Sequence, residues 1–412
     1  MIKLLTFTTL YPNAKRPSFG IFVENRMRHL VASGEATTTV LAPVPYVPAL
    51  PGVPESYRVW HDVPLREERH GIEIFHPRYF LLPKISMSVA PFSLYRAAKR
   101  KLLSLRADGF DFDLIDAHYF YPDGVAAILL GRYFRKPVTI SARGSDINIL
   151  PRFRLPRRMI RWAAAKADAI ITVSEALKTS LIGLGARPDK IHVLRNGVDL
   201  ATFAPGDRAH ARARAGFHGP TLLSVSNLIP LKSHSLAIGA LTHLPGMTLA
   251  IAGEGPERRN LERLAQQLGV ADRVRFLGRV AHDALPDYYR AAEVSLLLST
   301  DEGMANVLLE SMACGTPVVA TPVGGTPEVI TSPSVGELVA ERSAEAVAHA
   351  VEQLLARQPD PGAVRAYAER FGWDATTRGQ LNLFGAILDT RRRAVQARDA
   401  VAINGSRSVG SF

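Results

Sequence analysis

The chain has 412 residues, of which 47% are hydrophobic and 21% charged, and this length fits two domains of about 200 residues each better than one core. The apolar content excludes intrinsic disorder, and no uncharged apolar run reaches the roughly 18 residues that a membrane-spanning helix needs. The single cysteine, Cys314, excludes a disulfide framework and a zinc site built from cysteines. Because the apolar run at the N-terminus is too short for a secretory signal, we expect a soluble cytoplasmic protein.

The charge is distributed unevenly along the chain. The formal net charge is +12, and residues 1–206 hold 29 Lys and Arg against 17 Asp and Glu, whereas residues 207–412 hold 21 of each kind. A basic surplus favours an anionic partner, which leaves nucleic acid, a phosphorylated metabolite and an acidic membrane surface as candidates. The first half of the chain is therefore expected to meet that partner.

The first half alternates between predicted strands and helices. A β-rich run at 2–9 is followed by turn residues and a helical pattern at about 22–33. Further strand candidates are continuous apolar runs rather than alternating ones, which indicates a parallel sheet covered on both faces; they lie at 37–43, 113–118, 137–142, 169–174 and 191–195. Helical segments separate them, so we predict a doubly wound α/β domain. The proline-rich residues 44–66 read as a long irregular insertion.

The second half repeats this architecture. Turn formers and polar residues dominate 196–220, where we place the domain boundary. Strand candidates then follow at 221–227, 247–253, 274–278, 294–300 and 317–321, and terminal helices at 344–357 and 376–395. The predicted organisation is an N-terminal domain at 1–203, a C-terminal domain at 204–375, a terminal helix at 376–395 and a flexible tail at 396–412. Open α/β sheets bind ligands beyond the carboxyl ends of their strands, so two such domains predict a cleft between those edges.

The strongest chemical signal is VSLLLSTDEGMANVLLESMACGT at 294–316. A buried strand enters an acidic, glycine-containing loop, and a helix begins near Asn306, which suits an N-cap. The backbone amides of 303–307 and the helix N-terminus offer an anion site. Glu302 and Glu310 are separated by seven residues and can face one pocket, where a glutamate suits ribose hydroxyls. The alternative is a solvated loop acid plus an acid that interacts with the helix dipole.

This E-x7-E segment, continuing as ESMACGTPVVATPVGGTPEVI, resembles the donor signature of the family 4 retaining glycosyltransferases, which have the GT-B fold. Other segments follow that family's order, among them SVSNLIPLKSH (224–234) and IAGEGPERRNLERLA (251–265). The segments YPNAKRPSFGIFVENR (11–26) and ARGSDIN (142–148) resemble the branch that includes teichuronic-acid and other surface-polysaccharide transferases. The resemblance covers about residues 1–385. It implies two Rossmann-like domains facing across a cleft, with the C-terminal helix returning to the first.

The resemblance also implies a set of donor-binding residues in the second half. Lys232 would bind the donor diphosphate, Glu310 the ribose, and Glu302 the transferred sugar at the reacting centre. Asn227 stands where family members usually carry an arginine, so it offers hydrogen bonds but no charge. The remaining positions, in the glycine turn, the base-reading loop and the helix start, are Gly253, Glu254, Arg279, Gly303, Met304, Ala305, Asn306 and Val307.

Residues of the first half complete the implied site. Phe19 and Gly20 resemble the glycine loop that closes over the donor and acceptor. Arg143 stands where many relatives carry a histidine, and it cannot act as a neutral base. His118 ends a predicted strand, and the sequence leaves open whether it binds the acceptor or is a structural histidine. Asp146 suits either sugar hydroxyls or a helix cap.

Several classes of cofactor and partner are disfavoured. Asp111 and Asp113 form an Asp-x-Asp pair, but they precede their strand, which places them at the wrong sheet edge for a metal and suits a turn. No His, Asp and Glu cluster has metal spacing, so we expect neither a metal nor another cofactor, with Lys232 and backbone amides meeting the leaving-group charge. No G-x-G-x-x-G follows the first strand, which disfavours an oxidoreductase. No nucleic-acid motif accompanies the basic surplus.

The sequence therefore predicts a hexosyltransferase that moves a sugar from a UDP- or GDP-linked donor to a lipid-linked or polysaccharide acceptor. Basic amphipathic segments at 95–106 and 151–162 suit the anionic inner face of the plasma membrane, although an ordinary solvated helix face explains them too. Two alternatives remain. One is a sugar-nucleotide epimerase or phosphorylase of the same fold, and the other is a sugar-nucleotide-binding protein without transferase activity.

Overall fold

The computed structural model describes residues 1–46, 60–81 and 86–407, with side chains from residue 88 and up to residue 396 in the last of these ranges. The chain divides into two compact units. Unit 1 comprises Met1–Thr172, Leu181–Leu194 and Thr376–Phe412, and unit 2 comprises Val173–Ser180 and Arg195–Ala375. The main part of unit 2 thus begins at Arg195, somewhat before the boundary that the composition suggested at 203, and the chain returns to unit 1 at Thr376.

Unit 1 contains a largely parallel sheet whose strand order is β10-β9-β8-β7-β1-β2-β5-β4, with β4 antiparallel to β5. Its strands are β1 (Ile2–Phe7), β2 (Ala36–Leu41), β4 (Arg66–Arg69), β5 (Ile72–Phe75), β7 (Leu114–His118), β8 (Val138–Ala142), β9 (Ala169–Thr172) and β10 (Ile191–Val193). A separate pair joins β3 (Val44–Tyr46) to β6 (Arg78–Phe80). The predicted central strands are confirmed, because their buried apolar runs pack on both faces.

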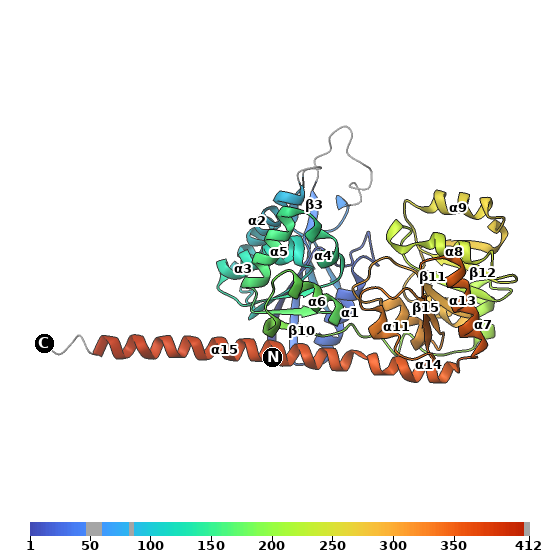
Figure 1. The fold of residues 1–412 in the computed structure, drawn as a ribbon. Helices are drawn as coiled ribbons and strands as arrows, with labels where there is room; N and C mark the ends of the chain where they lie inside the picture. Colours follow the sequence, from blue (N-terminus) through green and yellow to red (C-terminus); the bar gives the residue numbers. More distant parts are fainter. Residues whose placement is uncertain (47–59, 82–85, 408–412) are drawn as a thin grey trace, which may run out of the picture. The chain divides into compact units, whose positions relative to one another are not determined.

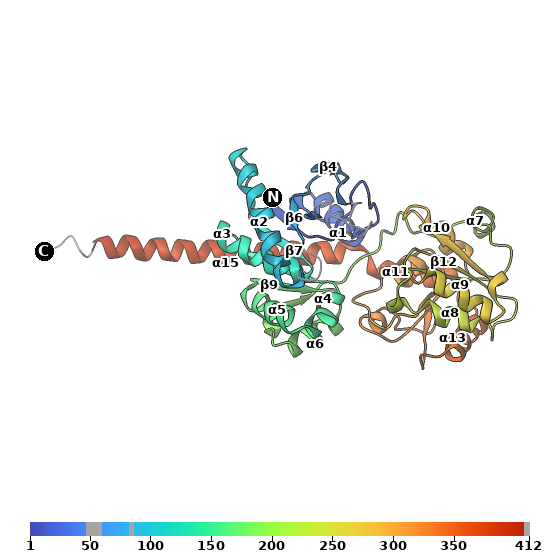
Figure 2. The same ribbon diagram turned by 90° about the horizontal axis from the view of Figure 1, so that it is seen from above.

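Helices cover both faces of this sheet (Figure 1). They are α1 (Ile21–Ala32), α2 (Ser86–Ala107), α3 (Val125–Phe134), α4 (Ser145–Asn148), α5 (Arg154–Lys166), α6 (Glu175–Gly183, which begins in unit 2) and α15 (Trp373–Arg407). α2, α3 and α5 pack against one another, whereas Met27 and Leu30 of α1 share a core cluster with Leu381 and Phe384 of α15. Helical structure continues beyond residue 395, and the C-terminal part of α15 extends past the rest of unit 1 (Figure 2).

The irregular insertion expected at 44–66 is only partly described. Residues 47–59 lie outside the described ranges, but Val44–Tyr46 and Arg66–Arg69 are strands rather than loop. The sequence REER at 66–69 hides this strand because all four residues are charged; Arg66 and Glu68 are exposed, whereas Glu67 and Arg69 pair with His76 and Glu24, and an edge strand accepts such charged residues. The expectation of irregular structure was therefore wrong at both ends of the segment.

Unit 2 contains a wholly parallel sheet with the order β13-β12-β11-β14-β15-β16. Its strands are β11 (Thr221–Val225), β12 (Thr248–Ala252), β13 (Val274–Gly278), β14 (Val294–Leu297), β15 (Val318–Ala320) and β16 (Gly336–Leu338). The helices are α7 (Arg208–Ala215), α8 (His234–Ala240), α9 (Arg258–Gln267), α10 (Leu285–Ala291), α11 (Asn306–Ala313), α12 (Thr326–Val329), α13 (Ala344–Ala356) and α14 (Pro361–Ala368). α9 and α14 lie on opposite sides of the sheet (Figure 1), so this unit is also doubly wound, as predicted.

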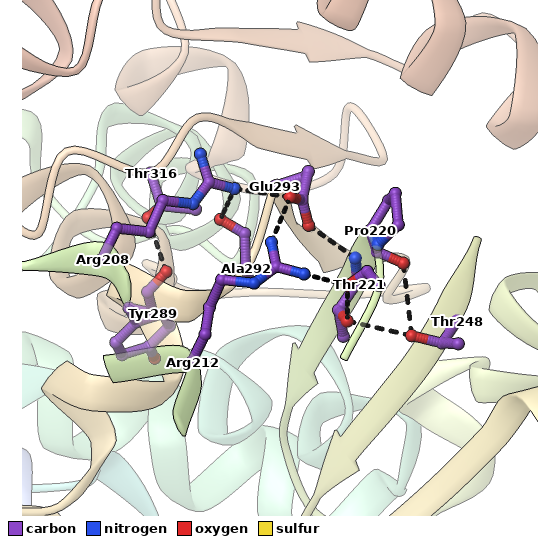
Figure 3. A network of polar contacts seen from close by, with 10 residues as sticks. Arg208, Arg212, Pro220, Thr221, Thr248, Tyr289, Ala292, Glu293 and Thr316 are labelled. Carbon is purple, nitrogen blue, oxygen red and sulfur yellow. Dashed lines mark hydrogen bonds and ion pairs between the residues drawn. The ribbon is translucent and has the colours of Figure 1, made fainter. Parts of the chain in front are cut away.

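Helix α7 occupies part of the segment that reads as a linker. Its Asp207 N-cap accepts from His210 N, and Gly216 ends it in a left-handed conformation. Glu293 holds the helix in place, because its carboxylate accepts from Arg208 Nη2 at 2.7 Å, Arg212 Nη1 at 2.8 Å and Thr221 N at 2.5 Å (Figure 3). This network ties α7 to the amino ends of β11 and β14.

Candidate functional site: a polar cluster at the switch point of unit 2

The order of strands in unit 2 contains a switch point. From β11 the chain builds outward through β12 and β13 on one side and through β14, β15 and β16 on the other. The connections leaving β11 and β14 therefore diverge, and open α/β sheets bind ligands in the crevice that forms at such a switch point, beyond the carboxyl ends of the strands. The residues that follow β11 and β14 are thus the first candidates.

Lys232 and Glu302 meet at this switch point. Lys232 follows β11, Glu302 follows β14, and Lys232 Nζ lies 2.5 Å from Glu302 Oε1. Ser299 Oγ donates to the same oxygen at 2.6 Å. Both charged side chains are mostly buried, 18% and 12% exposed. The predicted phosphate cation and the predicted sugar-binding carboxylate are therefore paired with each other in this structure.

The loop before α11 differs in one detail from the sequence prediction. Asn306 is the first helical residue, and Ala305 is the N-cap without a side-chain cap. The side chain of Asn306 instead accepts from Asn196 Nδ2 through its Oδ1 at 3.0 Å. Met304 lies beside it, with its sulfur 3.3 Å from Asn196 N, and Gly303, Met304 and Ala305 are buried. Leu308 N donates to the carbonyl of the N-cap Ala305 at 3.2 Å, and the N–H groups at the start of a helix generally have no carbonyl one turn before them, which favours an anion there.

Glu310 lies five residues into α11 and is 9% exposed. Its carboxylate is bound by two groups that the sequence analysis missed, His282 Nε2 at 3.1 Å from Oε1 and Tyr289 Oη at 3.0 Å from Oε2. His282 precedes α10 and Tyr289 lies within it, and no motif or spacing marks either one. Glu310 and Glu302 therefore have separate sets of partners.

The glycine turn after β12 packs against the loop after β11. Gly253 has φ 155°, and a Cβ there would overlap the carbonyl of Ser226, so a side chain is excluded. The neighbouring Glu254 pairs with Arg279 at 3.1 Å, and both side chains are about half exposed. Asn227 is exposed, and its carbonyl accepts from Ile229 N. The turn is thus held close to the switch point, with an exposed ion pair beside it.

The predicted residues of unit 1 belong to a second polar cluster. His118 ends β7 and is fully buried, with Nε2 3.1 Å from Asp116 Oδ2 and Nδ1 hydrogen-bonded to Arg143 Nη2. Burial lowers the pKa of His118 to about 4, so the imidazole is neutral at pH 7. Burial also lowers the pKa of Arg143, to about 10. Neither ring nitrogen of His118 faces solvent, which is the geometry of a structural histidine.

Asp146 lies inside α4, whose N-cap is Gly144, and its carboxylate bonds to nearby backbone N–H groups rather than standing open to a sugar. Its Oδ1 accepts from the backbone N–H groups of Arg143 and Gly144 at 3.0 and 2.8 Å, and its Oδ2 accepts from Phe120 N at 2.8 Å. These bonds fix the loop that carries Arg143. Gly20 is the N-cap of α1 with φ 72°, and a Cβ there would overlap the carbonyl of Leu10. Phe19 packs edge-on against Trp60 at 5.7 Å.

Asp111 and Asp113 lie at the amino end of β7, as predicted. Asp113 Oδ2 accepts from Lys3 N at 2.8 Å, and Asp111 pairs with Lys136 at 3.1 Å. Within residues 1–46, 60–81 and 86–407, no group of three or more His, Cys, Asp or Glu side chains is arranged to hold a metal ion. In the same part of the chain, no helix has the length and hydropathy that crossing a membrane requires.

Comparison with known families agrees with this architecture. Residues 22–202 match the model described as glycosyltransferase family 4, and residues 208–371 match the model described as glycosyl transferases group 1. The D-inositol 3-phosphate glycosyltransferase of Acidothermus cellulolyticus is 36% identical over 348 residues, which are 77% of this chain and 76% of that protein. The enzyme of the same name from Frankia alni is 34% identical over 69% of this chain and 76% of its own length.

Solved structures show the same fold. HepE of Anabaena, crystallised with UDP, has a TM-score of 0.71 at 20% identity and covers 94% of this chain and 100% of its own. Sucrose-phosphate synthase of Thermosynechococcus elongatus has the same TM-score and identity, over 97% and 100%. The fold is thus the α/β GT-B fold of glycosyltransferases, as the sequence predicts. The chain belongs to glycosyltransferase family 4, and it is a hexosyltransferase.

Proposed function

We propose that this enzyme transfers a hexose-type sugar from a nucleoside diphosphate sugar, with UDP or GDP as carrier, to a lipid-linked or polysaccharide acceptor in cell-surface glycan synthesis. The observation that carries the donor assignment is the pairing of Lys232 with Glu302 at the switch point of unit 2. Lys232 supplies the positive charge that a diphosphate needs, and the start of α11, which follows the loop of Glu302, offers backbone N–H groups to the same phosphates. HepE, which shares the fold, was solved with UDP and with UDP-glucose, which supports a nucleotide-sugar donor.

In this proposal each residue of the switch point has a distinct role. Lys232 and the backbone amides of 303–307 stabilise the departing diphosphate, and Glu310 accepts hydrogen bonds from the ribose. Glu302 contacts the transferred sugar after Lys232 has turned to the phosphates. Gly253, Glu254 and Arg279 border the nucleotide. Transfer proceeds with retention of the anomeric configuration, as the family resemblance implies. It needs no metal, because the fixed positive groups meet the leaving-group charge.

The acceptor is proposed to bind to unit 1 around Arg143, which follows the carboxyl end of β8 and whose guanidinium is held by the buried His118, with Gly20 at the start of α1 completing the site. The curated relatives are named for D-inositol 3-phosphate, and their 34–37% identity favours a phosphorylated polyol as a second candidate acceptor. The basic surplus of residues 1–206 suits either an anionic lipid head group or a sugar phosphate. The same family resemblance to teichuronic-acid transferases motivates the surface-glycan assignment.

We also propose that unit 1 attaches peripherally to the inner face of the plasma membrane. α2 and α5 carry exposed apolar side chains beside their basic residues, with Phe92 50% exposed, Leu103 44% and Phe153, just before α5, 47%. Apolar groups that insert at the head-group level and cations that meet anionic lipids both strengthen such binding. Sedimentation with liposomes tests this: binding that ignores anionic lipid content and salt contradicts membrane attachment.

The transfer activity is tested by incubating the purified protein with UDP- and GDP-sugars and a panel of acceptors that includes lipid extracts, oligosaccharides and inositol phosphates. The expected result is acceptor-dependent release of nucleoside diphosphate, unchanged by EDTA and abolished by Lys232→Ala. Interconversion of sugar epimers without an acceptor would favour an epimerase instead. Nucleotide binding without turnover across the whole panel would leave a binding protein as the better description.

A further inference from the structure

The carboxylate of Glu310 is held by two protein donors from a different element. His282 Nε2 lies 3.1 Å from Oε1, and Tyr289 Oη lies 3.0 Å from Oε2. Each oxygen of the carboxylate thus has one protein partner. A carboxylate offers about four acceptor positions, so each oxygen retains one more. Two adjacent hydroxyl groups, spaced as in a cis-diol, match two remaining acceptor positions on one planar carboxylate.

The two donors are themselves held in place. Tyr289 is fully buried, and its carbonyl accepts from Thr316 Oγ1 at 2.6 Å, a contact visible in Figure 3. The ring of Phe203 packs edge-on against His282 at 5.1 Å and against Tyr289 at 6.1 Å. Neither donor can turn away from Glu310 without disturbing this aromatic packing. The orientation of the carboxylate is therefore set before any ligand arrives.

We propose that His282 and Tyr289 are positioning residues for ribose recognition: they fix the plane of the Glu310 carboxylate so that it accepts from both hydroxyls of the donor's ribose. This inference rests on the proposed function, in which Glu310 meets the ribose. It assigns a role to two residues that have no motif of their own. It also predicts that the enzyme distinguishes ribonucleotides from deoxyribonucleotides through His282 and Tyr289, although neither contacts the nucleotide.

The charge environment of His282 gives this arrangement a pH dependence. The groups that act on it are Glu310 on α11, Asp199 and Asp283, all of them acidic. Partial burial alone would lower the pKa of His282, but the hydrogen bond and charge of Glu310 outweigh it and raise the pKa above its ordinary value. The protonated imidazole therefore holds Glu310 most firmly at low pH, and its charge is lost as the pH rises through this raised pKa. Affinity for a ribonucleotide should weaken over that same interval.

The test compares UDP with 2′,3′-dideoxy-UDP, and GDP with its dideoxy form, by calorimetry on the full chain. His282→Phe keeps an aromatic ring against Phe203 but donates nothing, and Tyr289→Phe removes only the hydroxyl. Each variant is expected to lower the affinity for UDP about tenfold, which corresponds to one lost hydrogen bond to a charged group. The affinity for the dideoxy compound should change by no more than about twofold. His282→Gln, which keeps an N–H donor, should recover part of the loss. In turnover, the donor KM should rise while kcat at saturating donor stays unchanged.

The outcomes separate this inference from the proposed function. If Glu310→Gln abolishes the preference for UDP over the dideoxy compound while the His282 and Tyr289 variants keep it, the positioning role is wrong. If Glu310→Gln itself leaves the preference intact, Glu310 does not meet the ribose and the proposed site is wrong. Equal weakening of both compounds by Tyr289→Phe would show a general structural role and would also overturn the inference. If the wild type prefers UDP over the dideoxy compound equally at every pH while His282→Phe loses that preference, His282 acts only through its hydrogen bond. In that case the proposed dependence on its charge is wrong.

Discussion

The pairing of Lys232 with Glu302 makes opposite predictions for its two members. Without a ligand, Lys232 Nζ is committed to Glu302 Oε1 at 2.5 Å. In our proposal the donor diphosphate competes for the same ammonium group. Lys232→Met removes the cation altogether, whereas Glu302→Gln removes only the competing negative charge and keeps an amide oxygen for Ser299. The two variants should therefore change nucleotide affinity in opposite directions.

The magnitudes follow from burial and charge. Exposed ion pairs contribute about 0–1 kcal/mol and breaking a buried one costs about 3–5 kcal/mol, so this pair, 18% and 12% exposed, should stabilise the fold by about 2 kcal/mol. Loss of a charged contact to phosphate costs a similar free energy, so Lys232→Met should lower the affinity for UDP or GDP roughly 30-fold. Glu302→Gln should strengthen the same nucleotide about threefold to tenfold, because less of the ion pair must be broken on binding.

Urea denaturation and calorimetric titration measure these effects, with Arg187→Met as a control. Arg187 forms an exposed pair with Asp189, and its loss should change the free energy of unfolding by less than about 0.5 kcal/mol. Both site variants should be destabilised, and the double variant by less than the sum of the two, because each single change already removes the pair. If Glu302→Gln lowers nucleotide affinity as much as Lys232→Met does, Lys232 does not leave Glu302 to bind the diphosphate.

Three further predictions concern stability. Burial lowers the pKa of His234 to about 4, so the unfolded chain binds a proton at this residue before the folded chain does as the pH falls. Between pH 6.5 and 4 the free energy of unfolding of the wild type, measured in urea, should fall by about 3 kcal/mol more than that of His234→Asn. The same pH dependence in both proteins would contradict this. Glu293→Gln removes the carboxylate that accepts from Arg208, Arg212 and Thr221, and it should lower the free energy of unfolding by about 3 kcal/mol. Glu337→Gln removes a carboxylate paired with Arg357 and should lower it by less than about 1 kcal/mol. Equal losses would contradict the stabilising role of the Glu293 network. Gly253→Ala should lower the free energy of unfolding by more than about 3 kcal/mol, because the new Cβ would overlap a carbonyl. Gly246→Ala has φ 81° but open space around the new Cβ, so it should lower it by about 1 kcal/mol. A higher melting temperature for Gly253→Ala than for Gly246→Ala would contradict the close packing of the turn.

The central sheets could be predicted because a parallel strand covered on both faces has a recognisable local sequence, a short and nearly continuous apolar run. Runs such as Leu222–Val225 and Val294–Leu297 are apolar except for one serine each and are bounded by turn residues, so each one identifies a strand by itself. Helix α7 has no such recognisable sequence, because among its residues only Ala211 and Ala215 are buried and arginines make up much of the rest. It is held by Glu293, which immediately precedes β14 and lies about 80 residues further along the chain, and a local sequence pattern cannot reveal such a distant pairing.

The candidate site divides in the same way. Glu302 and Glu310 stand out through their spacing, and Lys232 stands out because it follows a strand. The partners of Glu310 could not be found, because Tyr289 and His282 lie 21 and 28 residues before it and only the packing of α10 against α11 unites them. The ambiguity of His118 was also a matter of packing. Only the structure shows that both of its ring nitrogens face Asp116 and Arg143 inside the fold.

The most direct test of the account is a crystal structure of the full chain with UDP or GDP bound. We predict that the diphosphate lies at the start of α11 with Lys232 Nζ turned from Glu302 to a phosphate oxygen, and that both ribose hydroxyls lie within hydrogen-bond distance of Glu310. A nucleotide bound elsewhere on the chain, with the Lys232–Glu302 pair intact, would contradict the proposed donor site.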